Sequence, residues 1–91
     1  MAIDTAGIAR IDAFLATLGG EITPQVADLA LRRLLPGIEM RHCDASDVLE
    51  DAFRETAEID LHLLDTAGHC IRVTTDPAEA TAILIAGKVR S

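Results

Sequence analysis

Residues 57–75, AEIDLHLLDTAGHCIRVTT, decide the fold that we predict for this chain. Apolar and polar residues alternate through 57–64 and again through 70–75, on either side of a segment that contains Gly68. Successive side chains of a strand point to opposite faces of a sheet, so this alternation is typical of two strands that each bury one face. The stretch therefore predicts an antiparallel hairpin.

The length of the turn decides which residues of the hairpin face one another. A loop of three residues that ends at Gly68 pairs Leu63 with Ile71. The same register pairs Leu61 with Val73, so the apolar side chains of both strands share one face. Three-residue hairpin loops favour a positive φ at their third position, which glycine adopts without strain. We therefore expect this register, with Gly68 at positive φ.

A first helix is expected over residues 4–18. Apolar residues recur there at every third or fourth position, which is the spacing of one helix face. They are Ile8, Ile11, Phe14, Leu15 and Leu18. We expect the helix to end at Gly19-Gly20, because glycine commonly terminates helices.

A second helix is expected to begin at Thr23-Pro24 and to stop at Pro36-Gly37. Threonine caps a helix N-terminus well, and proline in the first helical position loses no N–H that the helix needs. Its buried face is predicted from apolar residues at helical spacing. They are Val26, Leu29, Ala30 and Leu34, with Leu31 and Leu35 widening the stripe.

The pattern then changes to a period of two over residues 38–43, which predicts a strand. Residues 46–55 are expected to form a helix capped by Asp44 or Ser46, and a partly ordered acidic loop is the alternative. The apolar face of that helix would carry Val48, Leu49, Ala52 and Phe53.

The last segment contains a helix start and a strand. Asp76-Pro77 combines an N-cap residue with proline at the first helical position, which predicts a helix of one or two turns. Residues 83–86 are all apolar and predict a short buried strand that ends at Gly87.

We therefore predict a single α+β domain over residues 1–91. A helical hairpin occupies residues 1–35, and residues 37–87 form the sheet. The sheet is expected to be mainly antiparallel, with about four strands and with the helices packed on one face.

The charge of the chain limits its partners. The net charge is −7, and residues 44–60 hold seven acidic residues against one base, Arg54. Such a field repels phosphate backbones, and the chain has no Tyr or Trp to stack on bases, so we expect no nucleic-acid partner. A solvated face is the ordinary reading of the acidic block.

No membrane partner and no export signal are expected. No apolar run approaches the ~18 residues that span a membrane. Charged residues such as Asp4 and Arg10 interrupt the start of the chain, where a signal peptide needs an apolar run. We therefore expect a soluble protein in the cytoplasm, with both cysteines reduced.

Two His-Cys dipeptides raise the question of a zinc site. They are His42-Cys43 and His69-Cys70. Adjacent residues of a strand point to opposite faces, so we do not expect all four to bind one ion.

A different group of residues shares the polar face of the predicted sheet. If strands 37–43 and 57–64 are neighbours, Cys43, His62 and Cys70 could approach one another and hold zinc through three ligands. The alternative is that the cysteines are inert packing residues and that His62 is exposed to solvent. Arg72 is expected opposite His62, in an ordinary cross-strand ion pair.

The C-terminal half resembles a known group of proteins. The pattern runs from Cys43-Asp44 through Asp47, Leu61 to Asp65, His69-Cys70, Thr75-Asp76-Pro77 and Ala80-Thr81. Over residues 36–86 it is similar to short, uncharacterised bacterial proteins that form a domain of unknown function. The resemblance implies no reaction.

No catalytic constellation and no phosphate-binding loop occur in the sequence. We therefore expect a non-catalytic accessory or regulatory protein that binds another protein, possibly a second copy of itself as a homodimer. The alternative is a metal- or thiol-bearing module built on Cys43, Cys70 and His62.

Overall fold

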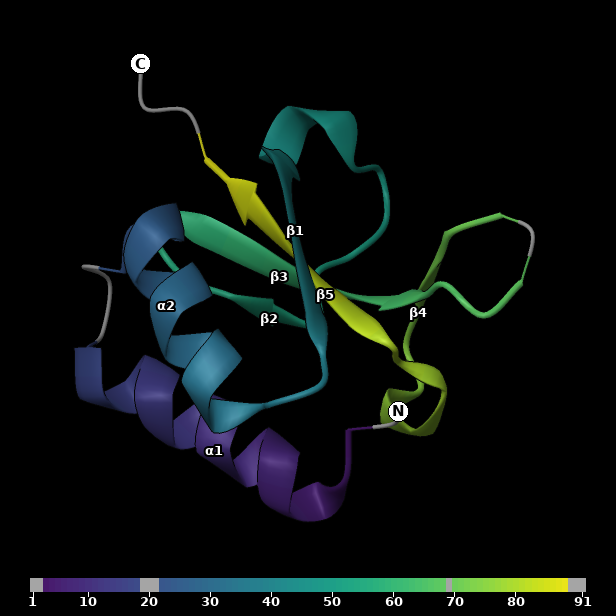
Figure 1. The fold of residues 1–91 in the computed structure, drawn as a ribbon. Helices are drawn as coiled ribbons and strands as arrows, with labels where there is room; N and C mark the ends of the chain where they lie inside the picture. Colours follow the sequence, from purple (N-terminus) through teal and green to yellow (C-terminus); the bar gives the residue numbers. More distant parts are fainter. Residues whose placement is uncertain (1–2, 19–21, 69, 89–91) are drawn as a thin grey trace.

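The computed structural model describes residues 3–18, 22–68 and 70–88. Two helices come first: α1 spans Thr5–Leu18 and α2 spans Pro24–Leu34. They lie side by side and antiparallel (Figure 1). Both predicted helices are confirmed, while the predicted stop at Gly19-Gly20 lies outside the described residues.

The start of α2 is the one that its sequence predicts. Thr23 Oγ1 accepts a hydrogen bond from the Val26 amide at 3.2 Å, and Pro24 is the first helical residue. After the helix ends, Gly37 adopts a φ of 93° and turns the chain toward the sheet. This left-handed conformation favours glycine, because a Cβ atom is strained there.

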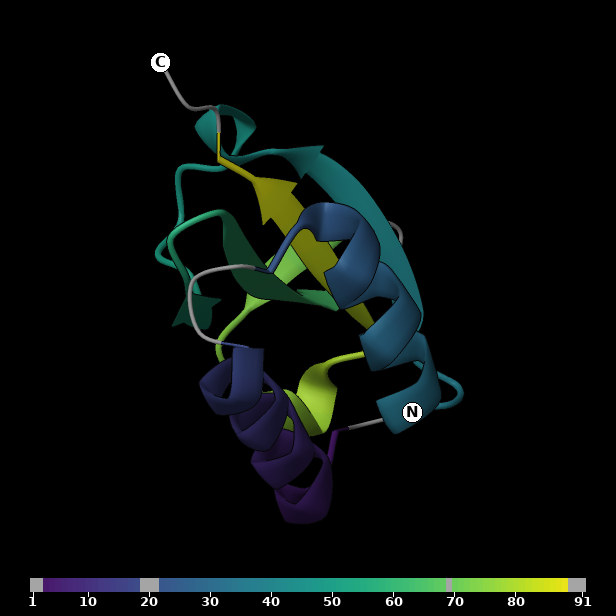
Figure 2. The same ribbon diagram turned by 90° about the vertical axis from the view of Figure 1, so that its left-hand side faces the viewer.

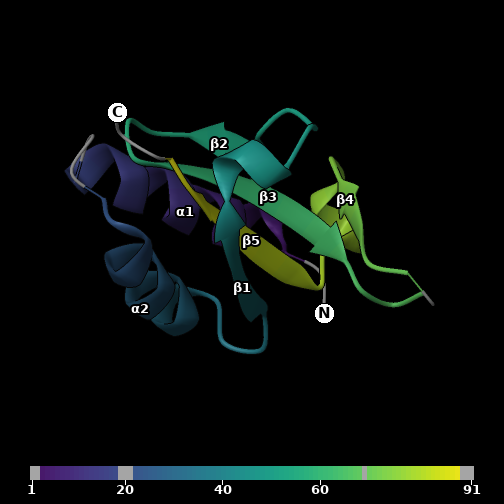
Figure 3. The same cartoon turned by 90° about the horizontal axis from the view of Figure 1, so that it is seen from above.

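Five strands form one mixed sheet. They are β1 (Glu39–Asp44), β2 (Arg54–Glu55), β3 (Ile59–Asp65), β4 (Arg72–Thr74) and β5 (Ala82–Gly87). The order across the sheet is β1-β5-β3-β2, and β4 pairs with the far end of β3 (Figure 3). β5 runs parallel to β1 and antiparallel to β3. The α+β class is confirmed, although the sheet has five strands and one parallel pairing where about four, mainly antiparallel strands were predicted.

One row of paired residues shows that both helices cover the same face of the sheet. Arg54, Leu61, Ile85 and His42 are successive partners across β2, β3, β5 and β1, and paired residues share a face. At one end of the row Arg54 bonds Asp12 of α1, and at the other end His42 Nε2 lies 3.3 Å from Asp28 of α2. Figure 2 shows the helices gathered on this side.

The core lies between these helices and the sheet, and β3 is buried on both of its faces. Ile59, Leu61 and Leu63 point toward the helices, while His62 and Leu64 point the other way. All five are at most 4% exposed. The prediction of a polar, solvent-facing side for β3 is therefore wrong at His62.

The predicted hairpin register is also wrong. Leu63 pairs with Thr74, and Leu64 pairs with Val73, so the two strands are joined by six residues, 66–71, instead of three. Ile71, the predicted partner of Leu63, is half exposed and lies outside β4.

The physical reason is the double burial of β3. The predicted register assumed that only one face of the strand needed apolar partners, but Leu64 is buried as well as Leu63, so face parity does not select a register. The turn is held instead by Thr66, whose amide donates to Thr81 Oγ1 at 2.8 Å. Gly68 is correspondingly not at positive φ; among the described residues only Gly37 is.

Residues 46–55 do not form the predicted helix. A short 3₁₀ turn, η1 (Ala45–Asp47), is followed by an extended loop and β2. The Phe53 amide donates to the Leu61 carbonyl at 2.8 Å, so pairing with β3 replaces helical hydrogen bonds here. The segment must also carry the chain from β1 at one edge of the sheet to β2 at the other, which an extended chain does and a compact helix does not.

The predicted cap before the last strand is confirmed. Asp76 Oδ1 accepts from the Ala78 amide at 2.9 Å and starts the 3₁₀ turn η2 (Pro77–Glu79). β5 then runs where a buried strand was predicted. Neither described helix is long and apolar enough to cross a membrane.

The predicted buried face of α2 is confirmed at Leu31 and Leu35 and wrong at Val26 and Leu29. Ala27, Leu31 and the following Leu35 are buried, whereas Val26 is 41% exposed and Leu29 is 65% exposed. The helix carries apolar residues on two sides, and only one side faces the sheet.

Candidate functional site

The outward apolar side of α2 forms a groove with α1. The groove has a volume of about 730 Å³, which falls in the ~300–1,000 Å³ range of ligand pockets. Its walls come from one side of each helix. The lining residues are Arg10, Ala13, Phe14, Thr17 and Leu18 of α1 and Val26, Leu29, Ala30, Arg33 and Leu34 of α2.

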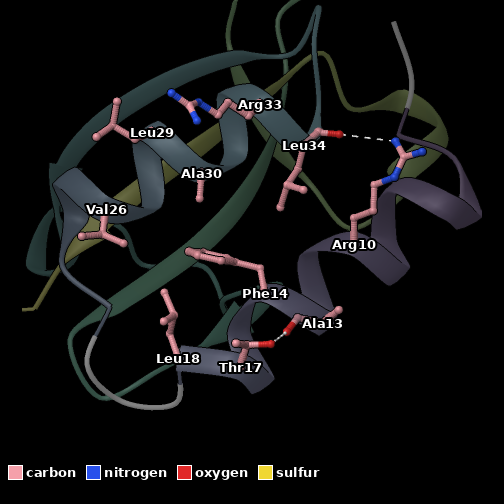
Figure 4. A pocket seen from close by; sticks show the side chains of 10 residues that line it. All are labelled: Arg10, Ala13, Phe14, Thr17, Leu18, Val26, Leu29, Ala30, Arg33 and Leu34. Carbon is pink, nitrogen blue, oxygen red and sulfur yellow. Dashed lines mark hydrogen bonds between the residues drawn. The ribbon is translucent and has the colours of Figure 1, made fainter.

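Phe14 fills the space between the two helices. Its ring points from α1 across toward Val26 and Ala30 of α2 (Figure 4). The ring is partly buried and packs against the core, so it forms a rigid apolar surface between the walls. Leu18 and Val26, which face each other at one end, remain 40% and 41% exposed.

Two arginines lie at the edges of the groove, apart from each other. Arg10 of α1 is at the end away from Leu18, while the Arg33 side chain, from the last turn of α2, extends along the outer side of that helix toward Leu29 (Figure 4). Arg10 makes a long hydrogen bond to the Leu34 carbonyl at 3.4 Å. Arg33 has no ion pair among the described residues, whereas its neighbour Arg32 bonds Asp28 at 2.9 Å.

No acidic residue lines the groove in the described part of the chain, although the chain has 15 of them. An apolar surface with guanidinium groups at its edges therefore lies on a chain of net charge −7. Such a site attracts a ligand that is apolar in the middle and carries negative charge at its edges.

The predicted metal trio is not gathered in the structure. Cys43 and His62 do share the face away from the helices, but β5 lies between their strands, since Cys43 pairs with Ala86 and His62 with Leu84. The condition on which the trio depended, that strands 37–43 and 57–64 are neighbours, is therefore not met. Cys70 lies in the exposed loop before β4.

No group of three His, Cys, Asp or Glu side chains suited to a metal ion occurs in the described part of the chain. His69 of the second dipeptide lies outside that part. Zinc binding by Cys43, His62 and Cys70 stays a prediction without a preformed site.

The two thiols differ in their surroundings. Both cysteines are free, Cys43 half-buried and Cys70 exposed. Burial, together with the nearby carboxylates of Asp47 and Asp44, raises the pKa of the Cys43 thiol. A raised pKa favours the protonated thiol at neutral pH, so Cys43 is not activated as a nucleophile.

His62 is the buried polar group of the far face. It is 1% exposed, and its Nδ1 atom has no hydrogen-bond partner among the residues that the structure describes. The residue predicted opposite it, Arg72, pairs with Asp65 instead, with 3.0 Å between Nη2 and Oδ2. The Ala67 amide and then Arg72 hold the pKa of Asp65 below its usual value.

The sequence did contain a signal for the groove. Ala27, Leu31 and Leu35 recur at intervals of four, so they complete a buried stripe without Val26 or Leu29. A helix with a second apolar stripe has more apolar surface than one sheet face can cover. The predicted buried face included Leu31 and Leu35 of this stripe but not Ala27, and it added Val26 and Leu29, which line the groove.

The fold and the groove define a small α+β domain with an open apolar site on its helical side. A model of a family of unknown function (DUF6129) matches residues 13–88. The chain belongs to this family, and the predicted resemblance to a domain of unknown function is confirmed over a longer range than residues 36–86. No curated protein and no solved structure matches the chain.

Proposed function

We propose that the chain is a non-catalytic accessory or regulatory protein of the cytoplasm that binds another protein through the α1–α2 groove. The partner chemistry that fits is an amphipathic segment with leucine-like side chains on one face and acidic residues beside them. The observation that carries the proposal is an apolar groove whose described lining includes Arg10 and Arg33 and no acid, on an acidic chain.

The exposed apolar area supports this proposal. Leu29 is 65% exposed on a regular helix, where a polar residue would cost nothing in packing. With Leu18, Val26 and Phe14 it forms a contiguous patch rather than a single exposed residue. Contiguous apolar patches edged by polar groups are typical of protein-binding surfaces.

The geometry favours a helical partner. Two antiparallel helices leave a straight groove between them, and an amphipathic helix fills such a groove with residues at positions i, i+3, i+4 and i+7. Negative residues along the edges of that helix would approach Arg10 and Arg33. These ion pairs direct orientation and association rate more than they add affinity.

Binding can be tested with a fluorescein-labelled amphipathic peptide that has leucines at helical spacing and glutamates beside them. Fluorescence anisotropy at low protein concentration should show saturable binding. A peptide with lysines in place of the glutamates should bind at least ~5-fold more weakly, because it meets Arg10 and Arg33 with like charge.

Two substitutions place the binding in the groove. Leu29→Gln and Arg33→Glu should each weaken the acidic peptide about tenfold or more. Leu49→Gln is the matched control, because it makes the same change at an exposed leucine outside the groove. Equal binding of the two peptides, or binding that Leu29→Gln leaves unchanged, would refute the proposal.

A further inference from the structure

A second exposed leucine lies far from the groove in an acidic setting. Leu49 is 94% exposed, more than any other large apolar residue of the described chain. It lies between η1 and β2, where the predicted helix is absent and no core contact covers it. Its neighbours in the chain are Asp47, Glu50 and Asp51, all exposed.

These acids are available for a partner. None of the three makes an ion pair or a side-chain hydrogen bond with another described residue. Their carboxylates and the Leu49 side chain therefore form an apolar knob edged with negative charge. We call residues 47–51 the acidic knob.

The acidic knob and the groove are complementary in apolar character and in charge. The knob offers one leucine among acids, and the groove offers an apolar channel with two arginines and no acid. The acids of the knob and the arginines of the groove carry opposite charge, so the two surfaces attract each other electrostatically.

The two surfaces of one molecule are separated. The groove lies between the helices at the lower left of Figure 1, and the loop after η1 lies at the upper right, beyond the sheet. A chain whose knob is on the other side of the sheet cannot fill its own groove.

We propose that the groove binds the acidic knob of a second copy of this chain, with Leu49 of one copy inserted beside Leu29 and Phe14 of the other. This inference rests on the proposed function of the groove and names its occupant. The contact joins two different surfaces, so an open head-to-tail assembly keeps one free groove at one end and one free knob at the other and can add further copies. We infer this open assembly; two copies that each place their knob in the other's groove would instead stop at a symmetric dimer.

Sedimentation velocity tests the proposal over protein concentrations from about 10 μM to about 1 mM, because a one-leucine contact is expected to be weak. The wild-type chain should sediment faster as concentration rises, beyond the value for a dimer. Raising the salt concentration from ~0.05 M to ~0.5 M should reduce association, because it screens the pairs between acids and arginines.

Two complementary variants give the decisive measurement. Leu29→Gln removes the groove's most exposed leucine and keeps the knob, while Leu49→Gln removes the knob and keeps the groove. Each alone should remain monomeric up to ~1 mM. An equimolar mixture should form a heterodimer of one copy of each, since one intact groove and one intact knob remain.

Ile71→Gln is the control, because Ile71 is half exposed and belongs to neither surface. It should associate as the wild-type chain does. A wild-type chain that stays monomeric, association that survives either leucine variant, or a mixture that stays monomeric would each overturn the inference.

The peptide experiment separates this inference from the proposed function. Leu49→Gln retains the groove, so it should bind the acidic peptide as tightly as the wild-type chain. If the peptide binds but the copies do not associate, the second copy is the wrong occupant and the groove still binds an acidic partner. If neither binds, both the inference and the proposed function fail.

Discussion

Strand β3 and helix α2 are both rich in large aliphatic residues, yet they use them differently. In β3 every one of Ile59, Leu61, Leu63 and Leu64 is at most 4% exposed. In α2 one stripe is buried and another, with Leu29, is open to solvent. A central strand is covered on both of its faces. A helix on the outside of a two-layer fold is covered on one side only. Apolar residues in a central strand therefore indicate the core. Apolar residues in an outer helix indicate either the core or a binding surface.

The largest effect that separates the two regions is expected from one substitution made in each. Leu61→Ala should lower the free energy of unfolding by about 3 kcal/mol, because it leaves a cavity in the closed core. Leu29→Ala should change it by less than about 0.5 kcal/mol, because solvent already surrounds the side chain. Urea denaturation followed by circular dichroism measures both.

The contrast fails if Leu29→Ala destabilises the chain as much as Leu61→Ala does. That result would mean that Leu29 belongs to the core and that the groove is closed in solution.

A smaller effect distinguishes the turn after α2 from the turn after β3. Gly37→Ala should cost about 1 kcal/mol or slightly more, because Gly37 has a φ of 93° and a Cβ atom is disfavoured in that conformation. Gly68→Ala should have little effect, since its added Cβ meets no atom closer than 4.0 Å and its φ is not in the left-handed region. Thermal unfolding of the two variants ranks them.

The reverse order, with Gly68→Ala the more damaging, would restore the three-residue turn that the alternation of residues 57–75 predicted.

The smallest effect concerns the ion pair that joins α1 to the sheet. The hydrogen bond from Arg54 Nε to Asp12, 2.6 Å long, holds the pKa of Asp12 below its usual value. A carboxyl with a depressed folded-state pKa stabilises the fold above its unfolded-state pKa of ~3.9, and this stabilisation disappears as the pH falls through the folded value. Both partners are more than a third exposed, so we expect less than about 1 kcal/mol.

Asp12→Asn should therefore lower the free energy of unfolding slightly at pH 7, and the difference from the wild-type chain should shrink toward zero at low pH. Urea denaturation at several pH values measures it. Asp51→Asn is the control, because Asp51 makes no ion pair with the described residues and should show no such change. A difference between Asp12→Asn and wild type that grows on acidification would contradict the assignment.

Local signals in the sequence predicted most helices and strands well. They predicted poorly which strands pair and in which register. The Thr23-Pro24 and Asp76-Pro77 caps start helical turns where expected, because a cap needs only residues three positions away. The register of β3 with β4 failed, because it depends on what covers the second face of β3, and that is decided by residues distant in the chain. The helix predicted at 46–55 failed for a related reason, since Phe53 bonds β3 instead of its own turn.

The sequence did not predict where the candidate site lies, although it identified many of the residues that form it. The predicted trio of Cys43, His62 and Cys70 assumed that β1 adjoins β3, and the insertion of β5 separates them. Six of the ten groove residues were named as parts of the apolar faces of two helices: Phe14, Leu18, Val26, Leu29, Ala30 and Leu34. Only the tertiary structure shows that Leu29 and Val26 face away from the sheet.

The position of β5 has a consequence for how the chain acquires its structure during synthesis. β5 follows every other strand in sequence, yet it occupies the middle of the sheet between β1 and β3. Until residues 82–87 have left the ribosome, β1 has no partner and β3 exposes an unpaired, apolar edge. Nonlocal strand pairing of this kind slows folding and leaves aggregation-prone intermediates. Nascent chains on neighbouring ribosomes of one messenger RNA would therefore be most prone to associate with one another just before β5 emerges.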